Sequence, residues 1–376
     1  MKRTFLFCLI FCCFQTLVRA QQYVISAELT GFADRTKFYL KDTDAGIIID
    51  SVEIKDGKFT MKGKSSEVKS FWLFARPNND YRYTTFLIGP EKISIRGDIK
   101  DFPRHVQLTG SKNQDVANKL TGQTRDLWKS RDSLVLLLRP HIGQTPTDSL
   151  KAITNPIGKQ ISQIDSLLEL ATSNFIKENL NSHSGLREFY DKKRNYKRAD
   201  FEALFNTVDP ELKNSTFGKR IADYLKVGNV LKKGESFYDF EANNINGKKY
   251  RLSDYKGKYI LLDFTETYCG PCILSTEDLK KLSAKYANQL QIISFYVEKD
   301  KKTIKEGLTR DKPTWPCLWD GKGTYSEIVL KYGVAGTPTF VVIDPEGKIQ
   351  SRFSGFEKDE NGKGSLANRI DKLLQP

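Results

Sequence analysis

The fold is decided by residues 259–272, which read YILLDFTETYCGPC. The first six residues form an almost unbroken apolar run, which is typical of a strand in a sheet that is covered on both faces. Cys269 and Cys272 follow this run, and residues 272–287 then have the apolar spacing of a helix. The stretch therefore predicts a buried strand that leads into a helix, with both cysteines at the start of that helix.

The two cysteines are expected to have different surroundings. Cys272 shares a helix face with Leu279, Leu282 and Tyr286, so its side chain should point toward the core. Cys269 precedes the helix, where free backbone N–H groups and the helix dipole lower the pKa of a thiol from about 8.5 to about 7. We predict that Cys269 is the exposed nucleophile and that the shielded Cys272 resolves the mixed disulfide.

The remainder of residues 234–376 continues this βαβ-like pattern. Further apolar runs lie at 291–297 and 339–344, and helical stretches separate them. Residues 344–348, DPEGK, predict a tight turn into a last strand at 349–353, and residues 366–374 predict a closing helix. The sequence therefore predicts an α/β domain in the C-terminal part of the chain.

The chain before this domain has two other patterns. Residues 21–112 contain short β-like runs with turn signals between them, such as 47–54 and 71–74, and predict an all-β sandwich or barrel module. Residues 113–230 have helical spacing and predict a helical connector whose helices are broken at Pro140, Pro146, Pro156 and Pro210. Neither part contains a catalytic constellation.

Residues 1–20 have the pattern of a secretory signal peptide. Lys2 and Arg3 precede an apolar stretch at 5–18, and Val18-Arg19-Ala20 fits a small-residue cleavage site. A retained membrane anchor is the alternative, but the stretch is shorter than the ~18–20 residues that span a bilayer. We expect cleavage after Ala20 and a protein of the periplasm or cell envelope.

Composition and cysteine count narrow the function. The 376 residues are 39% hydrophobic, which favours a globular protein of two or three domains over a disordered chain, and the net charge is +14. A nucleic-acid partner is not expected, because an exported protein rarely meets one and the basic stretch 187–198 fits a charged helix face. Removal of residues 1–20 leaves three cysteines, an odd number that is unlike a disulfide-stapled domain.

Other roles for the cysteines are less well supported. Zinc would need four ligands, and besides the CxxC pair only Cys317 and three distant histidines remain, namely His105, His141 and His183. We therefore expect no metal and no cofactor. Cys317 lies between Trp315 and Trp319, and we interpret it as a small buried hydrophobic residue, with a third redox thiol as the alternative.

Three motifs of residues 234–376 resemble the TlpA-type, thioredoxin-like family of exported thiol–disulfide oxidoreductases, within the AhpC/TSA-like redoxins. They are the CxxC pair after its strand, KGKY at 256–259 and YGVAGTPT at 332–339. The resemblance implies an α/β thioredoxin-like fold and a thiol–disulfide oxidoreductase. The region upstream resembles an N-terminal extension of unknown function that often precedes such domains in exported proteins of Gram-negative bacteria.

The resemblance also implies roles for individual residues. Pro338 matches a cis-proline that faces the two sulfurs, and the backbone of Thr337 would pair with an incoming peptide. Asp263 matches a buried acid that takes the proton from Cys272, with a strand-end Asp bonded to backbone as the alternative. The substrate-binding surface would also include Tyr268, Gly270 and Pro271. Since thioredoxin has tryptophans at the positions of Thr265 and Tyr268, that surface is altered here.

The resemblance predicts a direction of electron flow and partners. A Gly-Pro pair between the cysteines is similar to reducing members near about −270 mV rather than oxidants near about −120 mV. The expected partners are protein disulfide substrates, including apocytochrome c thiols during cytochrome c biogenesis, and a membrane thiol relay as electron donor. Two alternatives stay open. One is a redoxin-like peroxidase, although Glu266 stands where that chemistry uses Thr or Ser, and the other is a scaffold protein with an inert disulfide.

Overall fold

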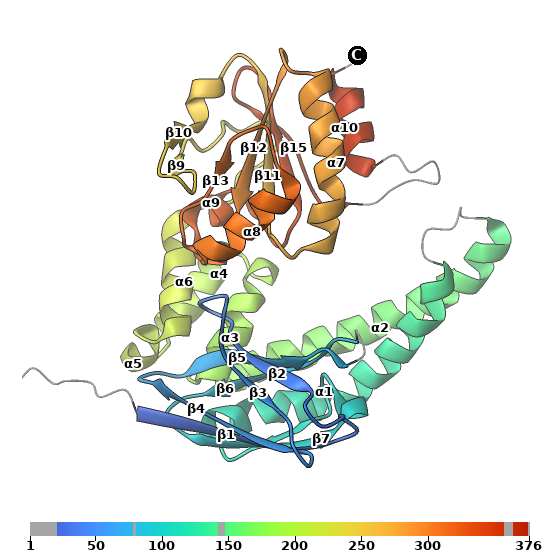
Figure 1. Ribbon diagram of the computed structural model, residues 1–376, viewed down its shortest axis with the longest axis vertical. Coiled ribbons are helices and arrows are strands. Elements are labelled where there is room, and N and C mark those ends of the chain that lie inside the picture. Colours follow the sequence, from blue (N-terminus) through green and yellow to red (C-terminus); the bar gives the residue numbers. More distant parts are fainter. Residues whose placement is uncertain (1–20, 78–79, 142–146, 357–363, 375–376) are drawn as a thin grey trace, which may run out of the picture.

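The computed structural model describes residues 21–77, 80–141, 147–356 and 364–374. The expected signal peptide and its cleavage site lie outside these residues. Figure 1 shows a β module formed by the first part of the chain, an α/β domain formed by the last part, and helices that connect the two. In the described part of the chain, no helix is long and apolar enough to cross a membrane.

The β module is a sandwich of two four-stranded sheets, with the orders β4-β1-β7-β8 and β3-β2-β5-β6. Side chains alternate between the core and the outside, so that Phe38 and Leu40 of β2 are buried while Tyr39 and Lys41 point outward. The strands are β1 Gln21–Thr30, β2 Lys37–Asp42, β3 Ile47–Glu53, β4 Lys58–Ser65, β5 Lys69–Ala75, β6 Arg82–Ile88, β7 Lys92–Asp98 and β8 Gln107–Thr109.

The orientation of the sandwich matters for the site. The β3-β2-β5-β6 sheet lies between the other sheet and the C-terminal domain, so its outer face is directed toward that domain (Figure 1). The inner faces of both sheets share one apolar core, which includes Ile25, Phe38, Leu73 and Phe86. The prediction of an all-β sandwich or barrel is therefore confirmed, and the module is a sandwich.

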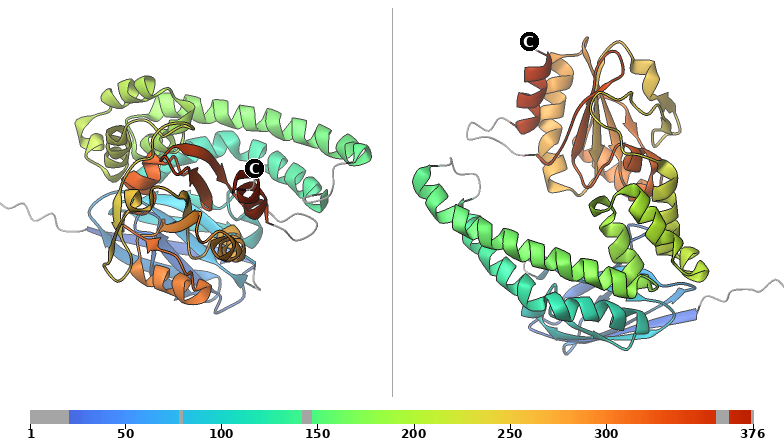
Figure 2. Two further views of the ribbon diagram at one scale, coloured as in Figure 1. Left: turned by 90° about the horizontal axis from the view of Figure 1, so that it is seen from above. Right: turned by 180° about the vertical axis from the view of Figure 1, so that it is seen from behind.

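The described residues of the connector form six α-helices. The first two make a long hairpin that extends away from the β module, and the others lie between the β module and the C-terminal domain (Figures 1 and 2). They are α1 Lys112–Leu138, α2 Asp148–Asn179, α3 His183–Asp191, α4 Arg198–Asn206, α5 Pro210–Lys213 and α6 Thr216–Val227.

One expectation for the connector was wrong. Pro156 does not break a helix but lies inside α2. A proline removes one helical N–H donor and frees the carbonyl of residue 152. Residues 151–153, 155 and 156 are exposed, so water can satisfy that carbonyl and the helix continues. Pro210, in contrast, occupies the first turn of α5, where its missing N–H costs nothing.

The C-terminal domain is built on a five-stranded sheet with the order β13-β12-β11-β14-β15. Strands β11, β12 and β13 run parallel to one another, whereas β14 and β15 are antiparallel to their neighbours. Its elements are β9 Glu241–Asn243, β10 Lys249–Arg251, β11 Tyr259–Thr265, α7 Gly270–Lys285, β12 Leu290–Tyr296, α8 Lys301–Asp311, β13 Cys317–Leu318, α9 Glu327–Lys331, β14 Thr339–Ile343, β15 Ile349–Ser354 and α10 Ser365–Leu374.

Both faces of this sheet are covered, as the apolar runs predicted. One face packs against α7 and α10, through Leu279, Leu282 and Ile370. The other face packs against α9 and the segment before β11, through residues such as Phe240 and Ile328. The packing of α7 on this sheet therefore fixes the position of the two cysteines at the start of the helix.

The connector contacts the C-terminal domain at several points. The guanidinium of Arg194 donates to the carbonyl of Gly333 at 2.8 Å, and the ammonium of Lys331 donates to the carbonyl of Val227 at 3.1 Å. The ring of Tyr325 joins the apolar cluster of α3 to α6, which also includes Val68 of the β module. These contacts hold the β module and the C-terminal domain in one arrangement.

Candidate active site

The cysteine pair lies where the sequence placed it. Cys269 is the N-cap of α7, and its Sγ accepts a hydrogen bond from the backbone N–H of Cys272 at 3.2 Å. Pro271 follows in the first turn of the helix, where a proline is well tolerated. The free N–H groups and the positive end of the α7 dipole therefore act directly on the Cys269 sulfur.

The two sulfurs form a disulfide but differ in exposure. Cys272 is only 3% exposed and lies on the buried face of α7 with Leu279 and Leu282, whereas Cys269 is partly exposed. The predicted difference between the two cysteines is confirmed. A reagent or substrate can approach this disulfide from the Cys269 side.

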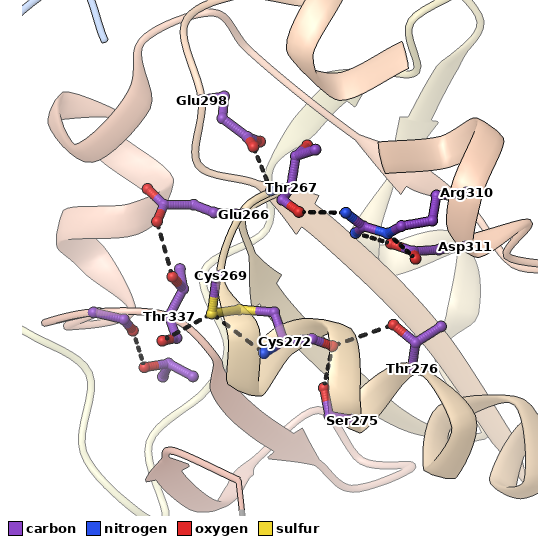
Figure 3. Close-up of a disulfide and its surroundings, with 12 residues drawn as sticks. Glu266, Thr267, Cys269, Cys272, Ser275, Thr276, Glu298, Arg310, Asp311 and Thr337 are labelled. Atoms are coloured by element: carbon purple, nitrogen blue, oxygen red, sulfur yellow. Dashed lines mark hydrogen bonds and ion pairs between the residues drawn. A yellow bond between two sulfur atoms is a disulfide. The ribbon is translucent and has the colours of Figure 1, made fainter. Parts of the chain in front are cut away.

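A loop from another part of the domain closes over Cys269. The Thr337–Pro338 peptide bond is cis, as expected, and the carbonyl oxygen of Thr337 lies 3.4 Å from the Cys269 Sγ. The hydroxyl of Thr337 in turn donates to a carboxylate oxygen of Glu266 at 3.0 Å. Figure 3 shows this line from Glu266 through Thr337 to the disulfide.

Two carboxylates lie near the cysteine pair. Burial raises the pKa of Glu266, while the hydrogen bond from Thr337 lowers it. Glu298 follows β12 and accepts a hydrogen bond from the backbone N–H of Thr267, and burial raises its pKa to about 7. Sequence reasoning did not identify Glu298. A Glu directly after a buried strand was the available signal, because the ends of parallel strands meet at one edge of a sheet.

Asp263 lies in the middle of the sheet and is buried. Its Oδ2 accepts a hydrogen bond from the Ser294 hydroxyl at 2.7 Å, while its Oδ1 has no hydrogen-bond partner within the described ranges. Burial raises the pKa of Asp263 to about 7, against the lowering effect of the Ser294 hydrogen bond. The alternative of a strand-end Asp bonded to backbone is wrong, because the partner is a side chain.

Cys317 lies in the same row as Asp263. In the register of the sheet, Asp263 pairs with Ser294 and Ser294 pairs with Cys317, so the three side chains share one face. The indole N–H of Trp315 donates to the Ser294 hydroxyl at 2.9 Å. Cys317 is 8% exposed, and burial raises the pKa of its thiol, which confirms the interpretation as a buried residue.

The remaining predicted site residues surround the disulfide. Tyr268 is 71% exposed, and its hydroxyl donates to Glu306 on α8. Gly270 is also exposed, and a Cβ added there would meet no described atom within 4 Å apart from its chain neighbours and the backbone of its own helix. Tyr268 and Gly270 therefore leave the surface beside Cys269 open to a large substrate. Among the described residues, no group of three or more His, Cys, Asp or Glu could hold a metal ion.

Two family profiles match the chain. The Redoxin profile matches residues 232–369, which contain the disulfide, Asp263 and Pro338. The profile of a domain of unknown function, DUF4369, matches residues 23–117, which form the β module and the start of α1. The two matches lie on either side of the helical connector, and the cysteine pair lies in the Redoxin match.

Individual relatives match the C-terminal domain. The thioredoxin-like protein YneN of Bacillus subtilis is 32% identical over 128 residues, which are 33% of this chain and 73% of YneN. The thiol-disulfide oxidoreductase ResA of Geobacillus thermodenitrificans is 29% identical over 134 residues, which are 35% of this chain and 75% of ResA. A solved thioredoxin domain of a thiol-disulfide oxidoreductase from Bacteroides vulgatus has 25% identity and a TM-score of 0.34, and it covers 39% of this chain and 99% of that domain.

Three findings determine the family of this chain: the CxxC disulfide at a helix start, the cis-proline beside it, and the sequence similarity to YneN and ResA. The chain belongs to the thioredoxin-like thiol–disulfide oxidoreductases of the Redoxin family and carries a DUF4369 domain before its catalytic domain.

Proposed function

We propose that this oxidoreductase reduces protein disulfides through Cys269 and Cys272. In the reduced enzyme, the Cys269 thiolate attacks one sulfur of the substrate disulfide, and the other substrate sulfur leaves as a thiolate. Cys272 then attacks the Cys269 sulfur, which releases the second substrate thiolate and forms the disulfide seen here. Two electrons pass from the cysteine pair to the substrate, and an external dithiol restores the enzyme.

The observation that carries this proposal is the difference in exposure between the two sulfurs. A nucleophile has to be reachable, and Cys269 is partly exposed at the positive end of α7. A resolving cysteine has to be protected from other thiols, and Cys272 is buried beneath it. An inert structural disulfide would need neither the exposure nor the helix start.

We assign proton transfer from Cys272 to Asp263. The Asp263 carboxylate lies on the face of the sheet that α7 covers, since Leu261 of the same strand packs with Leu279 and Leu282. A carboxyl group with a pKa of about 7 is half ionised near neutral pH and can both accept and return a proton. Burial of Asp263 is the cause of this raised pKa.

The substrate chain would lie beside the cis-proline loop. The Thr337 carbonyl faces the Cys269 sulfur, and the exposed ring of Tyr268 offers an apolar surface next to it. Pro271 and Gly270 add little bulk at the helix start. Since this surface is open, a flexible or unfolded segment of a protein fits it better than a small molecule held on all sides.

We further propose that the enzyme acts in the cell envelope, after export directed by residues 1–20. An electron donor is needed in that oxidising compartment, and a membrane thiol relay fits this requirement. Clients would be wrongly oxidised proteins and the thiols of apocytochrome c, which have to be reduced before haem attachment. The signal pattern at Lys2, Arg3 and Ala20 supports this location.

The test is reduction of insulin by the chain without residues 1–20. Cys269→Ser should abolish turnover, whereas Cys272→Ser should accumulate a covalent mixed disulfide with its substrate. A matched control is Cys317→Ser, which changes a thiol of the same domain. Robust turnover of the Cys269→Ser variant would refute the assignment, and a measured reduction potential above about −150 mV would refute the reducing direction.

A further inference from the structure

The carboxylates Glu266 and Glu298 form a small acidic cluster beside the cysteine pair. Both are partly buried, and Glu266 reaches Cys269 through the side chain and carbonyl of Thr337. Neither glutamate has a Lys or Arg of its own domain among the described ion pairs. Two partly buried carboxylates beside a thiol disfavour its thiolate form. A nearby positive charge would offset this effect.

Lys41 of the β module supplies such a charge. It lies on β2, pairs in register with Trp72 of β5, and points outward on the sheet face that is directed toward the C-terminal domain (Figure 1). Its Nζ lies 5.8 Å from the centre of the Trp72 ring, which supports the side chain. Burial raises the pKa of both Glu266 and Glu298, and the hydrogen bonds from Thr337 and Thr267 together with the positive charge of Lys41 act in the opposite direction.

The turn that follows β2 is held against the C-terminal domain. Arg220 of α6 forms an ion pair with Asp44 in this turn, and its guanidinium lies 4.5 Å from the centre of the Tyr325 ring. The ammonium of Lys299, the residue after Glu298, lies 4.6 Å from the same ring. Arg220 and Tyr325 therefore connect the end of β2 to the segment that carries Glu298.

We propose that Lys41 of the DUF4369 domain is a positioning residue of the active site, which acts through Glu266 and Glu298 on Cys269. This inference rests on the proposed role of Cys269 as the nucleophile. The charge of Lys41 favours the ionised form of both side chains. An ionised Glu266 is the stronger acceptor for the hydrogen bond from Thr337, which holds the carbonyl of Thr337 against the Cys269 sulfur. The β module thereby sets the charge state around the thiol.

Other charged or titratable groups also surround the two carboxylates, and the test has to distinguish their effects from that of Lys41. They are Tyr268 beside the disulfide, Glu306, Arg310 and Asp311 on α8, and Asp42, Lys69 and Arg220 around Lys299. Lys37 offers a matched control for Lys41. It lies on the same strand and the same outer face, and its Nζ is 5.5 Å from the Tyr39 ring.

The experiment measures the rate of Cys269 alkylation by iodoacetamide in the reduced full chain from pH 5 to pH 9. The wild-type profile should contain a carboxylate inflection near neutral pH in addition to the thiol inflection. In Lys41→Met or Lys41→Gln the carboxylate inflection should move up by about half a pH unit, because a nearby positive charge favours an ionised carboxylate. Lys41→Arg retains the charge and should keep the wild-type profile.

The controls decide between a specific and a general effect. Lys37→Met should leave the profile unchanged, and Glu266→Gln with Glu298→Gln should remove the carboxylate inflection and any further effect of Lys41→Met. An unchanged profile in both Lys41→Met and Lys41→Gln would overturn the proposal. A shift in Lys37→Met equal to that in Lys41→Met would also overturn it. Alkylation does not depend on turnover, so these outcomes are independent of the insulin assay.

Discussion

Cys269 and Cys317 lie in the same domain, but their surroundings are opposite. Cys269 caps a helix, is partly exposed and faces the Thr337 carbonyl. Cys317 lies on the two-residue edge strand β13, where burial raises the pKa of its thiol. The comparison teaches that the place of a thiol in the fold decides its reactivity, since helix start and solvent favour the thiolate and burial opposes it.

The largest expected effect comes from removing each thiol in turn. Cys269→Ala should lower insulin reduction by at least about 10³-fold, to the uncatalysed background, because no other reachable thiol replaces the nucleophile. Cys317→Ala should keep turnover within about twofold, since it only shortens a buried side chain. Equal losses in the two variants would show that Cys317 takes part in electron transfer.

Asp263, on the same sheet face as Cys317, makes stability depend on pH. Its folded pKa of about 7 lies above the value of about 3.9 in an unfolded chain, so the folded state binds the extra proton between these values. The free energy of unfolding should therefore decrease as pH rises from 4 to 7, by about 4 kcal/mol at most.

Asp263→Asn isolates this contribution. The free energy of unfolding of the oxidised protein is measured with urea at pH 4, 6 and 8. As pH rises, the wild type should lose stability relative to Asp263→Asn. The same comparison in Glu277→Gln, an exposed glutamate on α7, should give parallel curves. Parallel curves for Asp263→Asn as well would mean that Asp263 is ionised throughout.

The rates at which Cys269 and Cys317 are alkylated in the folded protein measure the difference in their reactivity directly. In the reduced protein, iodoacetamide should modify Cys269 at least about 100-fold faster than Cys317, because only the thiolate reacts and Cys317 is both buried and protonated. Unfolding in urea should bring both rates to one value. Intact-mass and peptide analysis would follow the two sites, and fast native labelling of Cys317 would contradict the burial argument.

The smallest expected effect concerns the hydroxyl between Asp263 and Cys317. Ser294→Ala removes the hydrogen bond that lowers the pKa of Asp263, so this pKa should rise by about one unit. The pH range over which stability falls should then extend upward by the same amount. Ser275→Ala is the matched control, since that buried hydroxyl donates to the carbonyl of Cys272 instead.

Local patterns predicted much of this molecule. Each strand and helix for which the sequence predicted bounds between residues 259 and 374 is present within about two residues, because these elements have strong periodicity and clear turn signals such as Asp344 to Lys348. The CxxC pair was also predictable, since the helix start that activates Cys269 directly follows its strand. In these cases, the causes lie within a few residues of the effect.

Other features depend on contacts that no local pattern contains. The row Asp263, Ser294 and Cys317 exists only through the register of three strands, and β13 is too short to recognise in the sequence. The position of the β3-β2-β5-β6 sheet opposite the C-terminal domain depends on the path of the helical connector between them. The continuation of α2 through Pro156 depends on the exposure of that turn, which composition does not reveal.

The open space at Gly270 has a practical consequence. Apart from its chain neighbours and the backbone of its own helix, no described atom lies within 4 Å of a Cβ at this position, and its backbone is not in the left-handed region that favours glycine. Alanine can therefore replace Gly270 without a steric clash, and the exposure of this position leaves room for longer side chains to extend into solvent. An acidic or basic residue there would change the electrostatic potential at the sulfurs. Substitutions at this one position should therefore give a series of variants with graded reduction potentials.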